Sequence, residues 1–244
     1  MQQKIKRFYK TASAVPAPEA SATEDSAPGG FAVVLDGRPV RTPGRAALVL
    51  PTQVLAAAIA EEWQNQPEEV DPPSMPLNAL ACTAIDIVRP HRVQIVEDLL
   101  GFGGHDMLCY WTDETGELLR RQQQHWQPLL DWAAEALGAP LKKTCGIVSQ
   151  AQPPESLAAL QRSVETHDDL ALTALAAAAK AAGSLVIGLA LASGRIDAGE
   201  AFMLSQLDEL YQAERWGEDA EAVKRREALR GELESAERFL QLIR

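Results

Sequence analysis

One segment of the chain has to be buried, whatever fold the rest adopts. Residues 170–193 read LALTALAAAAKAAGSLVIGLALAS and contain one charged residue, Lys180. As a single helix the segment would be about 36 Å long, which is enough to cross a bilayer. Ten of its residues are alanine, which is only weakly apolar, and no aromatic residue marks a membrane interface. We therefore expect one or two helices in a protein core, with Gly183 and Gly188 permitting close packing, and no membrane insertion.

The N-terminal part is predicted to be β-rich. The segments FAVVL (31–35) and RPVRT (38–42) flank Asp36-Gly37, and both residues of such a pair tolerate the positive φ of a type I′ hairpin turn. AALVL (46–50) is expected to add a third strand. The preceding segment 11–30 is rich in Ala, Pro, Ser and acidic residues, so we expect it to be a flexible loop.

A change of periodicity follows the predicted strands. Thr52 can cap a helix over 52–66, on which Leu55, Ile59 and Trp63 share one face. An aromatic residue on the apolar face of a short helix brings a large buried area to its packing. We therefore expect Trp63 to anchor this helix on the β-rich unit.

The rest of the chain has an almost wholly helical pattern. Asp71, Pro72 and Pro76, in the proline-broken segment before it, are expected to fix the turn between the two domains. Helical periodicity covers 77–88, 91–101, 118–137, 155–166, 168–193, 197–215 and 218–243. Residues 142–150 are consistent with a lone strand or an extended linker. The predicted fold class is α+β, with a small β-rich N-terminal domain (1–76) followed by a larger all-helical C-terminal domain (77–244).

The chain is acidic, with 34 Asp and Glu against 23 Lys and Arg and a net charge of −11. Such a chain is repelled by the phosphate backbone and by anionic lipid, so we expect no nucleic-acid binding and no attraction to membrane surfaces. Its three cysteines, Cys82, Cys109 and Cys145, are widely spaced. They favour buried thiols in a reducing compartment over a disulfide framework.

No motif indicates a nucleotide, metal or catalytic site. A P-loop would need glycine at the positions of Leu137 and Lys142. His105, Asp106 and Cys109 lie close in sequence, but catalytic zinc needs two ligands one helical turn apart and a third elsewhere. We expect no metal and no cofactor. A small cytosolic hydrolase that uses His105, Asp106 and Cys109 is the alternative function.

The most informative polar cluster lies near the C-terminus, in LDELYQAERWG (207–217). A helix over this segment would turn an apolar stripe to one side and acidic side chains to the others. Acidic side chains can pair with a partner's arginine or lysine, or lie on a solvated face. The candidate partner-binding residues are Asp208, Glu209, Gln212 and Glu214. Trp216 and Gly217 end the helix, and we expect Trp216 to anchor this corner in the core.

Ten stretches, spread in order over nearly the whole chain, resemble one known family. They are RFYK (7–10), LDGRPVRTP (35–43), LVLPT (48–52), AIAEEW (58–63), VDPPSMPLN (70–78), TAID (83–86), DMLCYW (106–111), WQPLLDWA (126–133), GSLVIGLALA (183–192) and DELYQAERWGEDAEA (208–222). The family they resemble is that of the ATP synthase assembly chaperones often called the ATP-twelve family, found in mitochondria and alphaproteobacteria. The segment 15–30 is longer than the connection usual in the family, and the resemblance assigns it no role.

The resemblance implies a chaperone and not an enzyme. Members of that family are similar in fold to the prediction made here, with a β-rich N-terminal domain before a helical C-terminal domain. The resemblance also implies that the chain binds the free alpha subunit of the F-type ATP synthase head. There they shield the surface that the beta subunit later takes, and no ATP binding or hydrolysis is implied. Because RFYK begins at residue 7, we expect no presequence and a cytoplasmic, monomeric bacterial protein, with the mitochondrial matrix as the location of eukaryotic relatives.

A chaperone of this kind covers a patch that would otherwise aggregate, and then loses it to the larger native interface. A Kd in the micromolar to submicromolar range, about −8 to −10 kcal/mol, would serve that purpose. We expect Glu209 and Glu214 to pair with basic groups of the alpha subunit, because such pairs raise the association rate and fix the orientation.

Overall fold

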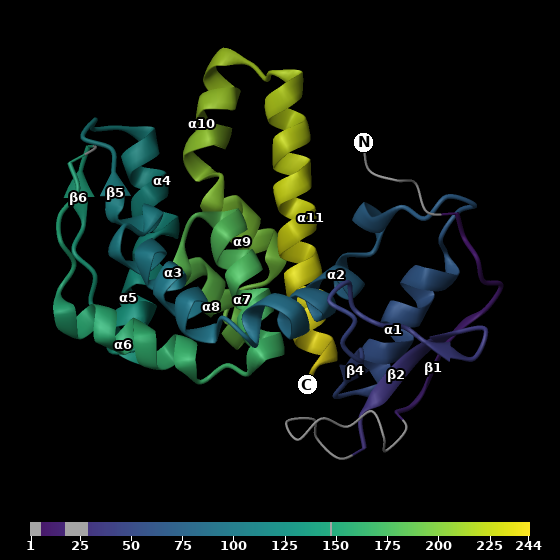
Figure 1. Cartoon of the computed structure of the whole chain (residues 1–244). Coiled ribbons are helices and arrows are strands. Elements are labelled where there is room, and N and C mark those ends of the chain that lie inside the picture. Colours follow the sequence, from purple (N-terminus) through teal and green to yellow (C-terminus); the bar gives the residue numbers. More distant parts are fainter. Residues whose placement is uncertain (1–5, 18–28, 147) are drawn as a thin grey trace. The chain divides into compact units, whose positions relative to one another are not determined.

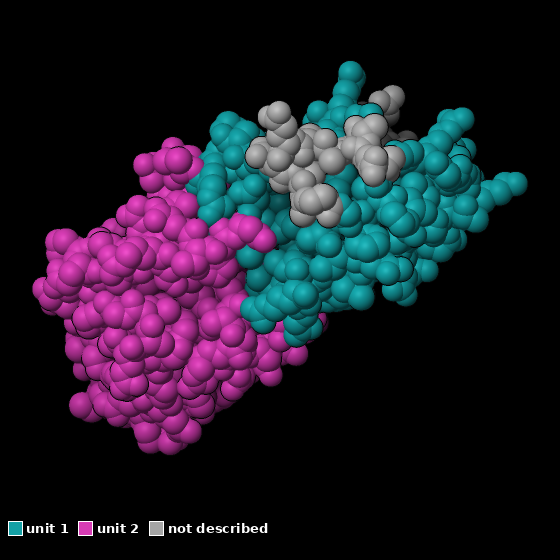
Figure 2. Space-filling model, turned by 90° about the horizontal axis from the view of Figure 1, so that it is seen from below, with its two compact units in different colours: residues 1–92, 169–173, 238–244 teal, residues 93–168, 174–237 magenta. Residues whose placement is uncertain are grey.

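The computed structural model describes residues 6–17, 29–146 and 148–244. Contacts divide the chain into two compact units, which Figure 2 colours separately. The first unit comprises residues 1–92, 169–173 and 238–244, and the second comprises 93–168 and 174–237. A division by contacts does not test independent folding, so the predicted domain boundary after residue 76 stays a prediction.

A small antiparallel sheet organises the first unit (Figure 1). Its strands are β1 (Ala12–Pro16), β2 (Phe31–Leu35), β3 (Arg38–Pro39) and β4 (Val49–Leu50). Strand β2 is central, because it pairs with β1 over its whole length and also with β3 and β4. Asp36 and Gly37 join β2 to β3 with φ of 46° and 80°. These positive φ angles confirm the predicted hairpin turn.

Strand β1 corrects the expectation of a flexible loop over 11–30. Residues 12–16 pair with β2 throughout, and the Asp36 carboxylate accepts a hydrogen bond from the Thr11 N–H at 2.9 Å. Strand pairing uses backbone groups and needs no large apolar side chain, so a loop-like composition did not prevent it. Residues 18–28 of the same segment lie outside the described residues.

Helix α1 (Gln53–Gln64) begins where it was predicted to begin. The Thr52 Oγ1 accepts a hydrogen bond from the Leu55 N–H at 3.2 Å, and α1 packs on β1 and β2 with Leu55 and Ile59 fully buried. The 3-10 turn η2 (Pro72–Ser74), helix α2 (Pro76–Thr83) and the π-helical turn η3 (Ala84–Val88) follow.

The predicted turn at Asp71 and Pro72 lies within the first unit. The Asp71 N–H donates to the Gln66 side chain at 2.7 Å, and the Asp71 carbonyl accepts from the Ser74 N–H at 3.0 Å. These bonds order the start of η2. Their effect on the placement of any domain stays a prediction.

The larger C-terminal part is helical, as predicted, and includes one short parallel strand pair. Its helices are α3 (Arg92–Gly104), η4 (Met107–Cys109), α4 (Glu117–His125), α5 (Gln127–Ala136), α6 (Pro154–Glu165), α7 (Asp169–Ala182), α8 (Leu185–Ser193), α9 (Ala198–Ser205), α10 (Leu207–Trp216) and α11 (Ala220–Leu242). The α+β fold class is confirmed by this order of a small strand region before a larger helical region.

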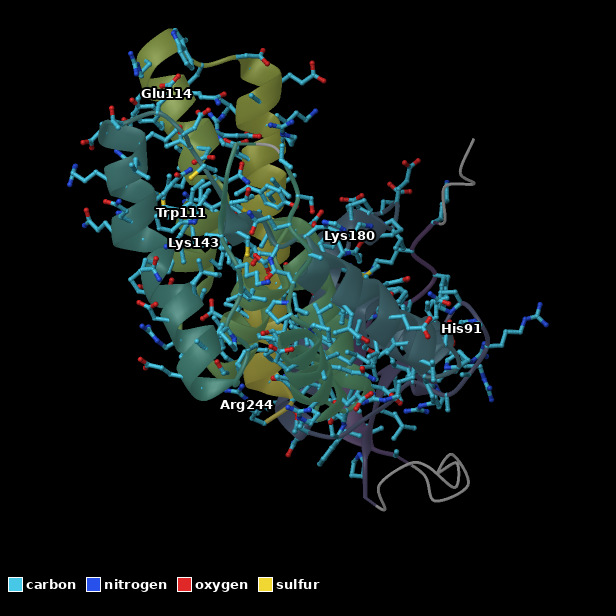
Figure 3. All side chains as sticks on the ribbon, turned by 90° about the vertical axis from the view of Figure 1, so that its left-hand side faces the viewer. His91, Trp111, Glu114, Lys143, Lys180 and Arg244 are labelled. Atoms are coloured by element: carbon cyan, nitrogen blue, oxygen red, sulfur yellow. The ribbon has the colours of Figure 1, made fainter. Side chains whose placement is uncertain are left out.

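The strand pair consists of β5 (Tyr110–Trp111) and β6 (Thr144–Cys145). It resolves the reading of 142–150 in favour of a short strand. The Lys143 ammonium lies 4.1 Å from the centre of the Trp111 ring, and Figure 3 shows these two side chains together. Cys145 is exposed, unlike the buried Cys82 and Cys109, so the expectation of buried thiols holds for two of the three cysteines.

The apolar segment 170–193 forms two helices, α7 and α8, which break at Gly183 and Ser184. The Ser184 Oγ accepts from the Ile187 N–H at 3.0 Å and caps α8, whose residues 185–192 are all buried. A Cβ added to Gly188 would lie 3.0 Å from the Ala179 Cβ, so α7 and α8 touch backbone to backbone here. Over the described ranges, no helix combines the length and the apolar character that a membrane span requires.

Candidate partner-binding groove

Helices α9 and α10 were predicted as one helix over 197–215, and the chain breaks this helix at Gln206, where φ is −107° and ψ is 12°. Helix α9 is tied at its start by a capping box in which the Asp197 carboxylate accepts from the Glu200 N–H at 2.7 Å. Near its end, the Leu204 carbonyl accepts a hydrogen bond from the Trp126 indole at 2.9 Å. The short helix is therefore held at both ends.

A groove of about 1100 Å³ lies in the second unit, with α9 and α10 along it and α4, α5 and α11 around it. Figure 1 shows α10 between α4 and α11. The apolar lining is Pro128, Leu129, Ile196, Phe202, Met203, Leu204, Leu207, Leu210 and Ala213. Met203 is 54% exposed, so at this position the apolar floor is open to solvent.

Charged side chains border the apolar floor. They are Glu117, Arg120, Arg121, Arg195, Glu200, Glu214, Glu218 and Arg230. Glu117 pairs with Arg120 at 2.6 Å and with Arg121 at 3.0 Å, and Arg121 also reaches Glu214 of α10 at 2.8 Å. Hydrogen bonds from Arg120 and Arg121 lower the pKa of Glu117 to about 2. The bond from Arg121 likewise lowers the pKa of Glu214, so both carboxylates are ionised at neutral pH.

The four predicted partner-binding residues lie on different sides of α10. Glu214 lines the groove, whereas Glu209 pairs with Arg225 of α11 at 2.6 Å. The Asp208 carboxylate accepts from the Gln122 side chain of α4 at 3.0 Å. Burial raises the pKa of Asp208. Gln212 is exposed, and its side chain forms no hydrogen bond within the described part of the chain.

Trp216 does not anchor the corner in the core, because its side chain is 73% exposed. Leu207 is buried at the start of the same helix. Trp216 follows it by nine residues, which is about two and a half helical turns and points the opposite way. Gly217 ends α10 as predicted: its φ is 90° and its N–H donates to the Ala213 carbonyl at 2.9 Å.

The tryptophan that does anchor this region is Trp126, which sequence reasoning assigned no role. It is 1% exposed, and besides its bond to Leu204 it separates α4 from α5 within the predicted helix 118–137. Pro128, two residues later, has no N–H to continue the α4 ladder. A tryptophan directly before a proline-started helix was the available signal for this role.

Trp63 is half-buried in the first unit. Its indole donates to Asn78 Oδ1 at 3.0 Å, and its carbonyl accepts from the Tyr9 hydroxyl at 2.6 Å. The Tyr9 ring meets the indole edge to face at 5.8 Å. These contacts tie α1 to α2 and to the segment before β1, and the anchoring role stays a prediction.

The residues of the alternative hydrolase are arranged for structure. Asp106 is fully buried and its carboxylate accepts from the N–H groups of Leu108 and Val186 at 3.1 and 3.0 Å. Burial raises the pKa of the Cys109 thiol to about 12, which disfavours the nucleophilic thiolate. His105 contacts Ser149 at 3.1 Å. Across the described residues, no group of three or more His, Cys, Asp and Glu side chains is placed to hold a metal ion.

Comparison with known proteins agrees with this architecture. The family described as "ATP12 chaperone protein" matches residues 6–134, more than half of the chain. "Protein atp12, mitochondrial" of Schizosaccharomyces pombe is 26% identical over 238 residues, covering 88% of this chain and 81% of the relative.

Two solved structures share the whole fold. The crystal structure of Atp12 from Paracoccus denitrificans is 42% identical, covers 98% of both chains and gives a TM-score of 0.89. A protein of Agrobacterium tumefaciens is 37% identical over 98% of this chain and 86% of its own, also with a TM-score of 0.89. The chain therefore belongs to the ATP12 chaperone protein family, the family of ATP synthase assembly chaperones that its motifs resemble.

Proposed function

We propose that this protein binds the free alpha subunit of the F-type ATP synthase head through the groove lined by α9 and α10, and shields its beta-facing surface until assembly. The observation that carries the proposal is the groove itself, which combines an open apolar floor at Met203 with a border of charged side chains. Apolar surface surrounded by polar groups is typical of protein-binding sites.

The size of the groove suits temporary binding. The groove is lined by two short helices, α9 and α10, and a standard stable interface buries about 1,600 Å² in total. A contact confined to this groove and its border would be smaller than the native interface that must displace it. The chaperone would then lose the alpha subunit to the beta subunit without a chemical release step.

Glu209 and Glu214 remain our candidates for pairing with basic groups of the alpha subunit. Each already accepts hydrogen bonds from one arginine of this chain, at 2.6 to 2.9 Å. A carboxylate offers about four acceptor sites, so a partner's basic group can bind in addition to the internal arginine. On the same helix, Asp208 accepts a hydrogen bond from Gln122 and Gln212 is exposed, and both stay candidate contacts.

The proposal includes a non-enzymatic role, without metal or cofactor, and a monomer in the bacterial cytoplasm. The raised pKa of Cys109 and the structural hydrogen bonds of Asp106 support the non-enzymatic reading over the hydrolase. Its relatives of known structure from Paracoccus and Agrobacterium support an alphaproteobacterial origin.

The test is affinity capture after co-expression with the alpha and beta subunits of the host. We expect the tagged protein to retain alpha produced without beta, to ignore beta alone, and to release alpha when beta is added. Failure to retain alpha would contradict the proposal. So would retention that persists in excess beta.

Substitutions connect the capture to the groove. Met203→Lys places a charge on the open floor and should weaken capture at least tenfold, about 1.4 kcal/mol. Val93→Lys on α3 is the matched control, since Val93 is 74% exposed and does not line the groove. Replacing Glu209 and Glu214 together with Gln should also weaken capture and leave the thermal melt nearly unchanged. If Met203→Lys and Val93→Lys capture the alpha subunit equally well, the binding surface lies outside the groove.

A further inference from the structure

We infer that the partner segment seated in the groove is amphipathic and carries acidic side chains, which Arg195 and Arg230 receive. The inference rests on the proposed function and adds the chemistry of the partner's segment. It is the opposite of what the net charge of −11 suggests, because an acidic chain as a whole favours a basic partner.

Most charges that border the groove are already neutralised within the chain. Glu117 and Glu214 are paired with Arg120 and Arg121. Glu218 pairs with Arg226, a buried arginine of α11, at 2.7 Å. These pairs balance most of the charge on the α4 side, although the Glu214 carboxylate keeps acceptor sites for the single basic group proposed above.

Arg195 and Arg230 differ from the other two arginines of the lining. Both are exposed, and within the described ranges neither forms an ion pair with a carboxylate. Among the residues that the structure describes, Glu200 is the acidic lining residue without an arginine partner, and its side chain accepts from the Asp197 N–H at 3.3 Å in the capping box of α9. The uncompensated charge in the groove is therefore more positive than negative.

The structure also orients Arg230 for a carboxylate. Its guanidinium carbon lies 4.4 Å from the centre of the Phe202 ring, which is 5% exposed and fixed in the groove floor. A guanidinium held over an aromatic ring can keep an N–H edge for another partner. That edge matches a carboxylate with two parallel hydrogen bonds.

The apolar floor determines the rest of the segment. Leu207, Leu210 and Ala213 repeat at the spacing of one helix face along the groove, and Met203 opens beside them. A partner helix laid on such a floor presents apolar residues at helical spacing. Acidic residues at the edge of that face would reach Arg195 and Arg230, while the acidic surface elsewhere on the chain would repel the segment from wrong positions.

The test measures the Kd of purified alpha subunit for the full-length chain, at low and at high salt. The variants are Arg195→Glu with Arg230→Glu, the neutral pair Arg195→Gln with Arg230→Gln, and Arg230→Lys. Arg162→Glu on α6 is the matched control, because Arg162 is exposed and lies outside the groove lining.

We expect the double reversal to weaken binding by about 100-fold or more, since like charges are then placed together. The neutral pair should weaken binding by about tenfold and reduce its salt dependence, and Arg230→Lys should lie between it and the parent. The control should stay within about twofold.

Tighter binding by the double reversal would show that a basic segment occupies the groove, and would overturn the inference. Unchanged binding would overturn it as well. In both cases the parent still binds alpha, so the proposed function would stand. A parent that fails to bind alpha contradicts the proposed function itself.

Discussion

Two tryptophans of the helical part lie in opposite surroundings. Trp126, between α4 and α5, is 1% exposed and donates to the Leu204 carbonyl of α9. Trp216, at the end of α10, is 73% exposed, and the only ring contact of its indole within the described residues is the Arg215 guanidinium at 5.7 Å. The difference teaches that the apolar area of a side chain does not decide its burial. Its direction on the helix and the neighbours present there decide it.

Two carboxylates of the helical part, Asp106 and Glu214, show the same contrast between a buried and an exposed side chain. Asp106 is fully buried and held by backbone N–H groups, whereas Glu214 is exposed and held by an arginine. Burial raises the pKa of Asp106 to about 6, and the arginine lowers the pKa of Glu214. The buried Asp106 therefore supports the fold, and the exposed Glu214 is accessible from solvent.

The largest expected effect is that of Trp126→Ala. The substitution leaves a cavity and an unpaired Leu204 carbonyl, so it should lower the free energy of unfolding by about 3–5 kcal/mol. Urea unfolding followed by circular dichroism measures this change. Trp126→Phe keeps most of the volume and should fall between the alanine variant and the parent. If the alanine variant unfolds like the parent, Trp126 does not stabilise the core and does not differ from Trp216 in this respect.

The titration of Asp106 should change the free energy of unfolding by somewhat less than Trp126→Ala does. Its pKa of about 6 in the folded state lies above the unfolded value of about 3.9. The protonated Asp106 side chain therefore stabilises the folded state fully below about pH 4, and this contribution is lost as the pH rises through about 6. Relative to Asp106→Asn, the parent's free energy of unfolding should fall by about 2–3 kcal/mol across this window.

The exposed carboxylates act in another pH window, which separates the two effects. The pKa of Glu117 is lowered to about 2, so its contribution is present above its unfolded pKa of about 4.3 and is lost as the pH falls through its folded value. Urea unfolding at several pH values gives the difference curve. A difference between parent and Asp106→Asn that does not change with pH would contradict the role of Asp106.

Trp63→Ala tests an intermediate case in the first unit. The side chain is half-buried and loses its bond to Asn78 and its contact with Tyr9. We expect a loss of about 2 kcal/mol, less than for a core tryptophan. Thermal unfolding measures it, with Val54→Ala on the exposed side of α1 as control. If Trp63→Ala unfolds at the same temperature as the parent, Trp63 does not anchor α1 and is instead a surface residue available for contact with a partner.

The smallest effect on stability is expected for Trp216→Ala. An exposed substitution of this kind changes the free energy of unfolding by no more than about 0.5 kcal/mol. Exposed tryptophans often supply binding energy, so capture of the alpha subunit should weaken although the melt does not move. Unchanged capture together with an unchanged melt would show that Trp216 has neither role.

Local signals were sufficient for several elements. Asp36-Gly37 indicated the hairpin turn because only a few residue types accept positive φ at both positions. Thr52 indicated the start of α1 because a hydroxyl at that position satisfies a free N–H. Both outcomes depend on bonds between residues close in sequence. The resemblance to the family was also carried by short stretches and was confirmed.

Other features depend on residues far apart in the chain, and the sequence pattern did not reveal them. Strand β1 forms because β2 offers a free edge to a segment of loop-like composition. The groove collects side chains from positions 117 to 230, and Glu214 is the member of the predicted set that lines it.

The sequence by itself determined that most of residues 170–193 are buried, that strands precede helices, and that the chain belongs to its family. Periodicity, turn chemistry and motifs are local, and each specifies its own segment. Tertiary structure alone decided that Trp126 is the anchor and that Trp216 faces solvent. It also decided that Arg195 and Arg230 line a groove in which no carboxylate of the described residues forms an ion pair with them. The physical reason is that burial and charge pairing depend on which distant side chains arrive at the same place.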